Sequence, residues 1–487
     1  MHSPRVESTS ATWASCSERR TAISKNKQQD TRVGHRDGES EPDGIPVLRG
    51  NVAGLDVGSK SHWVCAPMVD GSTREVEEFG ATTPELERLA RWLQERKVAS
   101  VAMESTGVYW IPVHEILEQQ GLEVLLVCTR DLAQVPGRKK TDRIDCKWIQ
   151  RLHSCGLLKG SFRPTEQICM LRTLVRDKNN LLAERADWIR RMQKSLDQMN
   201  VRVHRAVSDI QGTTGMAIIR AIVSGQRDPA QLAQLRDPGC RMSAEQIAEQ
   251  LRGNWRADHL FSLEQSLRMY EAITERIQAY EEEILRRLAD MEPPDHHGKT
   301  APALANTNKA KMIRQRGEEV FRQAFYRMSG TDLTAIDAVG VGVAQLVLSE
   351  YGPDLSRFPT EKHFISHVTL APKASVSGGK PLKKKKRGSA SSRVSAALRS
   401  AALSLRHSHT ALGAYFRHTA HRLGADVAAF ATARKLATWI YRCLRWGQHY
   451  LDEGAAAYEQ RYQAARLNRL RTTAAQLGYS LVEVVSE

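Results

Sequence analysis

Short apolar runs alternate with polar turns over residues 50–130, and this pattern predicts a sheet. Five segments have the length and composition of strands: 51–58, 62–69, 74–81, 100–106 and 123–129. An amphipathic helix is predicted at 83–97, with Thr83 as its cap and Pro84 at its first position, and a second helix at 109–119. Three strands followed by strand–helix–strand units predict a mixed sheet flanked by helices, which is an α/β arrangement.

Acidic residues lie at the functional edge of this predicted sheet. Asp56 shares one strand face with Val52 and Gly54, and Glu104 ends its strand, where open α/β sheets bind ligands. Asp142 and Asp145 open a later helix with i, i+3 spacing, so they fall on one helix face.

The helix that Asp142 and Asp145 open is predicted to begin at a Thr141 cap. Its expected buried side consists of Ile144, Trp148, Ile149 and Leu152. Acids in a first helical turn also complement the helix dipole, and for Asp142 alone that interpretation is favoured. Four carboxylates gathered together repel one another unless a cation lies among them, so the set as a whole favours a Mg²⁺ or Mn²⁺ site.

Residues 166–330 read as almost wholly helical. One part has the 3/4 apolar spacing of a coiled coil, formed by Leu263, Leu267, Tyr270, Ile277, Tyr280 and Ile284. This spacing fits either an arm through which two chains associate or a helical hairpin within one chain. Residues 291–300 are a break and a hinge candidate, and 301–330 are polar with little periodicity until near their end.

Residues 331–352 contain Gly340 and Gly342 between apolar patterns of helical period, which indicates a helix-hairpin-helix. Bare backbone amides at such a helix start suit a phosphate. Two-glycine turns between packed helices also occur without ligands, so this signal is weak alone.

The chain carries a net charge of +16, which favours a polyanionic partner. No acidic residue occurs between Glu361 and Asp426, which indicates a surface that faces phosphates. Within this stretch Ser377 precedes Gly378, Gly379 and Lys380 on a loop where a serine nucleophile is conceivable, although Ser-Gly-Gly alone is an ordinary flexible loop. The candidate nucleic-acid contacts are Gly340, Gly342, Lys373, Lys380, Lys383, Lys384, Lys385, Lys386, Arg387 and Arg393.

The remaining bulk properties limit the class of protein. No apolar run approaches the roughly 18–20 residues that span a bilayer, so no membrane partner is expected. The eight cysteines form no C-x-x-C pair, which favours reduced thiols in a cytoplasmic protein. The expected regions are a disordered extension (1–49), a catalytic domain (50–165), a helical and coiled-coil region (166–330), a C-terminal domain with a serine loop (331–450) and a helical tail (451–487).

Several motifs in this order resemble the DEDD transposases of bacterial insertion sequences. They are GLDVGSK, MESTG, KTDRIDCKW, AVGVG, LAPKASVSGGK and ARKLATWIYRCL. The resemblance implies an RNase H-like (RuvC-like) N-terminal domain whose metal-binding acids match Asp56, Glu104, Asp142 and Asp145. It also implies a serine that attacks DNA, matched by Ser377, with Ser375 as the alternative.

The resemblance further implies partners and a location. These are donor and target DNA, a noncoding bridge RNA that pairs with both, and a homodimer that assembles to a tetramer at the bacterial nucleoid. Two other functions remain open. A junction-resolving nuclease would use water and leave free ends, and a non-enzymatic nucleic-acid scaffold would not need Mg²⁺.

Overall fold

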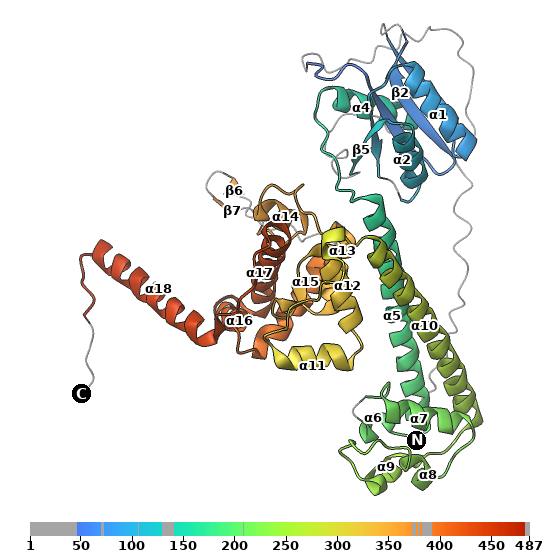
Figure 1. Cartoon of the computed structure of the whole chain (residues 1–487), viewed down its shortest axis with the longest axis vertical. Helices are drawn as coiled ribbons and strands as arrows, with labels where there is room; N and C mark the ends of the chain where they lie inside the picture. Colours follow the sequence, from blue (N-terminus) through green and yellow to red (C-terminus); the bar gives the residue numbers. More distant parts are fainter. Residues whose placement is uncertain are drawn as a thin grey trace, which may run out of the picture. The chain divides into compact units, whose positions relative to one another are not determined.

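The computed structural model describes residues 46–69, 73–105, 107–128, 141–207, 209–372, 376–377, 380–381 and 392–482 (Figure 1). The predicted disordered extension lies almost entirely outside the described residues. By its internal contacts the chain divides into two units, Met1–Phe162 and Arg163–Glu487. No helix in the described part combines the length and apolar character needed to cross a membrane.

The first unit contains the predicted mixed sheet. Its strands are β1 (Val52–Val57), β2 (Ser61–Pro67), β3 (Arg74–Gly80), β4 (Ser100–Glu104) and β5 (Glu123–Val127). Their order is β3-β2-β1-β4-β5, in which β1 and β2, and β2 and β3, are antiparallel, whereas β1 and β4, and β4 and β5, are parallel. The sheet and the largely helical remainder confirm the predicted fold class.

Strand alternation gives the central sheet two different faces. Leu55 and Met103 point into a core shared with α1 (Thr83–Glu95) and α2 (Trp110–Gln119). The opposite face packs against α4 (Asp142–Ser154), where Ala102 and Val127 meet Ile149 and Leu152.

The start of α1 differs by one residue from the prediction. Thr82, not Thr83, is the N-cap residue, and its side chain accepts no capping hydrogen bond. Thr83 is already helical, and Pro84 follows it in the first turn, where a missing N–H group has no cost.

In the second unit, α5 (Glu166–Gln198) and α10 (Ala257–Asp290) lie side by side (Figure 1). Their connection contains α6 (Val203–Ala206), α7 (Thr213–Val223), α8 (Pro229–Ala233) and α9 (Ala244–Gln250), which share one apolar core with the adjoining ends of α5 and α10. Of the predicted seam on α10, Tyr280 is half-buried and the other residues are buried. The structure of the single chain therefore shows the intramolecular helical pair.

In its described residues, the rest of the second unit consists of helices, their connections and one short hairpin. Its first helices are η1 (Pro294–His296), α11 (Thr307–Gln315), α12 (Glu319–Ser329), η2 (Leu333–Ala335), α13 (Val341–Tyr351) and α14 (Glu361–His367). The hairpin of β6 (Val376–Ser377) and β7 (Lys380–Pro381) comes next, before α15 (Arg393–Ser404), η3 (Leu405–His407), α16 (Ala411–Leu423), α17 (Ala425–Trp446) and α18 (Gly454–Gln476).

Two of these helices, α11 and α12, form where the sequence shows little periodicity. The reason is visible in α12, whose buried side includes Arg322 as well as Phe325 and Met328. A buried arginine reads as polar in the sequence and hides the helical apolar pattern.

Candidate active site

Two of the predicted acids lie next to each other at one edge of the sheet. Parallel β1 and β4 pair Leu55 with Met103, so the following residues, Asp56 and Glu104, occupy adjacent positions near the carboxyl ends of their strands. Both residues alternate with Leu55 and Met103, and they therefore belong to the face that packs against α4. Neighbouring strands are about 4.8 Å apart, so the backbones of Asp56 and Glu104 lie close together and their carboxylates can approach each other.

The helix α4 runs antiparallel to β1 across this face. Near its end, the Gln150 side-chain amide donates a hydrogen bond of 3.1 Å to the carbonyl of Val52, at the start of β1. Gly54 lies against the turn between Cys146 and Gln150, since a Cβ atom there would meet both the Cys146 carbonyl oxygen and the Gln150 amide nitrogen. Four helical residues and two strand residues each advance about 6 Å, so the first turn of α4 reaches the level of Asp56.

The first turn of α4 carries the other two predicted acids. Thr141 is the N-cap, as predicted, and its hydroxyl accepts a hydrogen bond of 3.4 Å from the Ile144 amide. Asp145 is buried, with 6% of its surface exposed, whereas Asp142 is exposed. The two acids therefore differ in environment although their spacing places them on one helix face.

The buried side of α4 is only partly the predicted one. Ile149 and Leu152 are buried, whereas Ile144 and Trp148 are half-buried. The helix also buries the less apolar Cys146, Gln150 and His153. It does so because it packs closely on Gly54 and makes specific polar contacts, such as the 3.0 Å contact of His153 Nε2 with Ser100 Oγ.

The side chains between α4 and the sheet are buried. Burial raises the pKa of the Cys146 thiol to about 12, and the nearby charges of Cys65 and Asp56 act in the same direction. Burial likewise raises the pKa of Cys65 to about 11 and lowers that of His153 to about 4. The effect of Asp56 on Cys146 also shows that this carboxylate lies close to the first turns of α4. This buried layer has a low dielectric constant, which strengthens electrostatic interactions at the adjacent Asp56 and Glu104.

The described side chains do not form an assembled metal site. Among the residues that the structure describes, no three His, Cys, Asp or Glu side chains are grouped closely enough to hold a metal ion. The donor chemistry at the edge nevertheless fits a hard divalent cation, because carboxylate oxygens are the ligands that Mg²⁺ and Mn²⁺ prefer. The backbone places Asp56 beside Glu104, and the first turn of α4, which carries Asp142 and Asp145, lies near the same end of the sheet.

Gly54 is a positioning residue that the sequence analysis did not select. A Cβ atom at this position would lie 2.1 Å from the Gln150 amide nitrogen and 2.4 Å from the Cys146 carbonyl oxygen. Only glycine therefore allows α4 to approach β1 this closely. The available signal was a glycine inside a strand, which often marks close approach of another backbone.

The predicted serine loop is a two-stranded hairpin in its described part. Ser377 of β6 pairs with Lys380 of β7, and Gly378 and Gly379 between them lie outside the described residues. The alternative Ser375 and the predicted contacts Lys373, Lys383, Lys384, Lys385, Lys386 and Arg387 lie outside the described residues. Arg393 is exposed at the start of α15, where the Ser392 hydroxyl accepts a hydrogen bond of 3.0 Å from the Ser395 amide.

The predicted two-glycine turn lies at the start of α13. Gly340 is the N-cap residue, and a Cβ atom at either Gly340 or Gly342 would meet no atom within 4 Å. The segment before the glycines contains the single 3-10 turn η2 rather than an α-helix. The amide end of α13 is consequently open to a ligand, but the first helix of the predicted helix-hairpin-helix is short.

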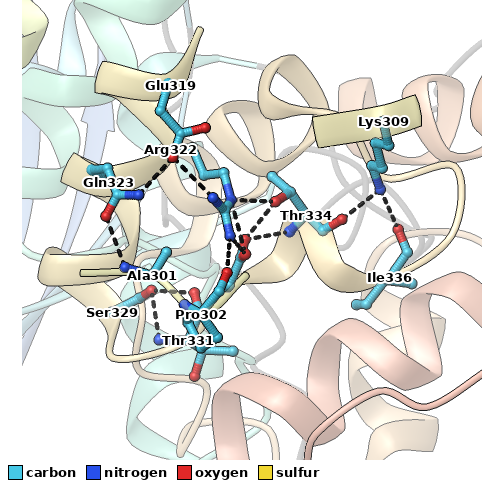
Figure 2. Close-up of polar contacts among 11 residues, drawn as sticks. Ala301, Pro302, Lys309, Glu319, Arg322, Gln323, Ser329, Thr331, Thr334 and Ile336 are labelled. Atoms are coloured by element: carbon cyan, nitrogen blue, oxygen red, sulfur yellow. Dashed lines mark hydrogen bonds and ion pairs between the residues drawn. The ribbon is translucent and has the colours of Figure 1, made fainter. Parts of the chain in front are cut away.

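Buried polar contacts hold the segment that leads into this turn (Figure 2). Arg322 donates to the Asp332 carboxylate at 3.0 and 2.6 Å, and to the Thr334 hydroxyl at 3.2 Å. Lys309 donates to the carbonyls of Thr334 and, at 2.8 Å, Ile336. Burial lowers the pKa of Lys309 to about 8. These contacts fix the backbone just before the open glycines.

Two family profiles match the chain. The profile for the DEDD domain of IS110 elements, described as "Transposase", matches residues 53–201. The profile described as "Transposase IS116/IS110/IS902 family" matches residues 330–417. A comparison with curated proteins finds no match.

The two matched regions contain the features built up above. The first includes the sheet, the four acids and α4, and the second includes the glycine turn and the serine hairpin. The DEDD domain also implies dependence on a divalent metal, in agreement with its carboxylate donors. The chain therefore belongs to the DEDD transposases of the IS110 family, and it is an enzyme that acts on DNA.

Proposed function

We propose that this transposase cleaves and rejoins the DNA strands of an insertion sequence with Ser377 as its nucleophile. We further propose that Asp56, Glu104, Asp142 and Asp145 hold the divalent cation, Mg²⁺ or Mn²⁺. One observation supports the proposal about the acids: the register of β1 with β4 puts Asp56 beside Glu104, and α4 runs antiparallel to β1, so that its first turn begins near the same end of the sheet.

The carboxylates would position a scissile phosphate through the cation. When bound, a divalent cation stabilises negative charge on phosphate oxygens during in-line displacement. The Ser377 oxygen would form a bond to phosphorus while the phosphorus–oxygen bond to the departing DNA strand breaks. The departing oxygen takes up a proton and becomes a hydroxyl, and a DNA hydroxyl later displaces the serine. The energy of the phosphodiester bond is thus retained without ATP.

The acid-free part of the C-terminal region is the proposed nucleic-acid surface. Among its described cations, Lys362, Arg393, Arg406, Arg417 and Arg422 are exposed. Together with the open turn at Gly340 and Gly342, they would contact phosphates and position the nucleic acid without reading its sequence. Target choice would then come from a noncoding bridge RNA that pairs with donor and target DNA.

Bringing two duplexes together requires more than one subunit, so we propose a homodimer that assembles to a tetramer. The seam of α10 is largely occupied by contacts within the chain. Any coiled-coil association between subunits would therefore use the outer surface of the α5 and α10 pair. As an enzyme of chromosomal DNA, the protein would act at the bacterial nucleoid.

The experiment is a covalent-adduct assay with labelled DNA from the flanks of the gene, RNA transcribed from the adjacent noncoding segment, and Mg²⁺. The wild-type protein should yield a labelled protein–DNA species. Asp142→Ala should abolish all cleavage, and Ser377→Ala should abolish the adduct, while the matched control Ser375→Ala should retain it.

Other outcomes identify the competing functions. Nicked DNA with free ends and no attached protein would indicate a water-dependent nuclease. DNA binding that persists without any cleavage, with or without Mg²⁺, would indicate a scaffold. An adduct that survives Ser377→Ala but not Ser375→Ala would identify Ser375 as the nucleophile.

A further inference from the structure

The distal half of α18 extends away from α16 and has no partner among the residues that the structure describes (Figure 1). Its first turns pack on α16, where the His418 ring stacks on Tyr462 with centroids 4.1 Å apart and contacts Glu459 at 2.7 Å. No residue of α18 is fully buried, and beyond Tyr462 every residue of the helix is exposed except Ala474, which is half-buried. This distal half lies outside both matched regions of the family.

The exposed segment carries an apolar seam of helical spacing. Leu467, Leu470, Ala474 and Leu477 follow one another at intervals of 3, 4 and 3 residues, which places them on one stripe. The three leucines are 43%, 50% and 69% exposed, respectively. Scattered exposed leucines are ordinary, but a regular stripe of them on an otherwise unpacked helix indicates a helical partner.

The charged residues that flank this seam are both arginines. Arg466 precedes Leu467 and Arg471 follows Leu470, so the two guanidinium groups occupy the positions beside the stripe that select coiled-coil partners. No acidic residue occurs between Glu459 and Glu483. Within the part of the chain that the structure describes, neither Arg466 nor Arg471 has an ion-pair partner.

This charge pattern distinguishes between possible partners. Pairing of α18 with a second copy of itself, parallel or antiparallel, would place arginines opposite arginines, which is unfavourable. Duplex DNA would satisfy the arginines but would leave the leucine stripe in water. An acidic amphipathic helix satisfies both features, because its carboxylates pair with the arginines while its apolar stripe covers the leucines.

We propose that the distal half of α18 is a docking helix for an acidic amphipathic helix of another protein. The seam of Leu467, Leu470 and Leu477 supplies the contact, and Arg466 and Arg471 select the charge of the partner.

The test uses full-length protein and three fluorescent probes measured by anisotropy. The first is a designed acidic peptide of about three heptads, with leucine or isoleucine at the seam and glutamate beside it. The second has lysine in place of the glutamates, and the third keeps the glutamates but has serine at the seam. We expect saturable binding of the first peptide, roughly tenfold or more tighter than either of the others.

Charge-reversal variants separate the seam from general basicity. The double variant Arg466→Glu/Arg471→Glu should lose the acidic peptide and gain the lysine peptide. Arg469→Glu is the matched control because Arg469 lies on the side of α18 away from the seam, and it should leave binding unchanged. Leu470→Glu should abolish binding, with circular dichroism confirming that the exposed substitution leaves the fold intact.

Three results would overturn the proposal. The first is equal binding of the acidic peptide and of its serine-seam version, which would mean that only non-specific charge attraction holds the peptide. The second is a duplex DNA probe that binds through this helix and is weakened equally by Arg466→Glu and Arg469→Glu, which would assign α18 to nucleic acid. The third is the absence of saturable binding by any probe.

Discussion

The close approach of α4 to β1 makes Gly54→Ala the most informative single substitution. The new Cβ atom would lie 2.1 Å from the Gln150 nitrogen, 2.4 Å from the Cys146 oxygen and 2.7 Å from the Gln150 Cα atom. All three are backbone atoms, so no side chain can rotate away to make room. Because non-bonded heavy atoms need about 3.5 Å, the helix must move away from the strand by about 1 Å or more.

This displacement should affect catalysis more than overall folding. Overpacking of a core costs about 1–3 kcal/mol, and the rigid backbone contact places this substitution at about 3 kcal/mol. Since α4 carries Asp142 and Asp145 while β1 carries Asp56, a shift of about 1 Å separates the proposed ligands and should slow DNA cleavage about 100-fold.

Cleavage kinetics and hydrogen exchange together measure the effect. Gly54→Ala should show slow cleavage and faster amide exchange in α4, while exchange in α5 and α10 remains at the wild-type level. Gly50→Ala is the control, since a Cβ atom at Gly50 meets nothing within 4 Å. Wild-type cleavage and wild-type exchange in Gly54→Ala would refute the argument that α4 positions the acids.

Three further outcomes follow from the described contacts. Arg322→Met leaves the Asp332 carboxylate buried without its ion-pair partner and should lower the free energy of unfolding by about 3–5 kcal/mol in urea melts, whereas the exposed control Arg316→Met should change it little. Burial lowers the pKa of His153 to about 4 in the folded protein, so below pH 6.5 the unfolded chain binds more protons than the folded one. The free energy of unfolding should therefore be full above pH 6.5 and fall by about 2 kcal/mol between pH 7 and pH 5 in urea melts. His153→Gln should flatten this pH dependence. Removal of divalent metal with EDTA should stop cleavage but preserve DNA binding in gel-shift assays, and loss of binding instead would contradict the assignment of separate metal and phosphate surfaces.

The sheet was predictable because each strand carries its own local signal. Alternation of Val52, Gly54 and Asp56 with Leu55 set the two faces of β1, and the structure has the same two faces. The cap of α1 was misplaced by one residue because Thr82 and Thr83 are adjacent and chemically equivalent. Only tertiary packing decides between them.

The buried side of α4 could be predicted only in part. Hydrophobic spacing correctly selected Ile149 and Leu152 but also selected Trp148, which is half-buried. The sequence gives no sign that Gln150 is buried, because its burial depends on one hydrogen bond to Val52, about a hundred residues away. Polar contacts between distant segments leave no periodic pattern.

The helices α11 and α12 fall within the region predicted to be helical, but their own periodic signal is weak for a related reason. Lys309 and Arg322 look like solvated charges in the sequence, yet Lys309 is half-buried, Arg322 is buried, and both donate hydrogen bonds to the segment before Gly340. A charged residue that serves an interior contact weakens the amphipathic pattern from which a helix is predicted.

Cleavage of the polypeptide by bound iron tests the central claim most directly. Fe²⁺ that replaces Mg²⁺ generates radicals in the presence of ascorbate and peroxide, and these cut the backbone next to the cation. If one cation site joins the carboxyl edge of the sheet to α4, cuts should appear together near Asp56, Glu104 and Asp145, and excess Mg²⁺ should suppress all of them. Cuts confined to one of these segments, or insensitive to Mg²⁺, would contradict a shared site.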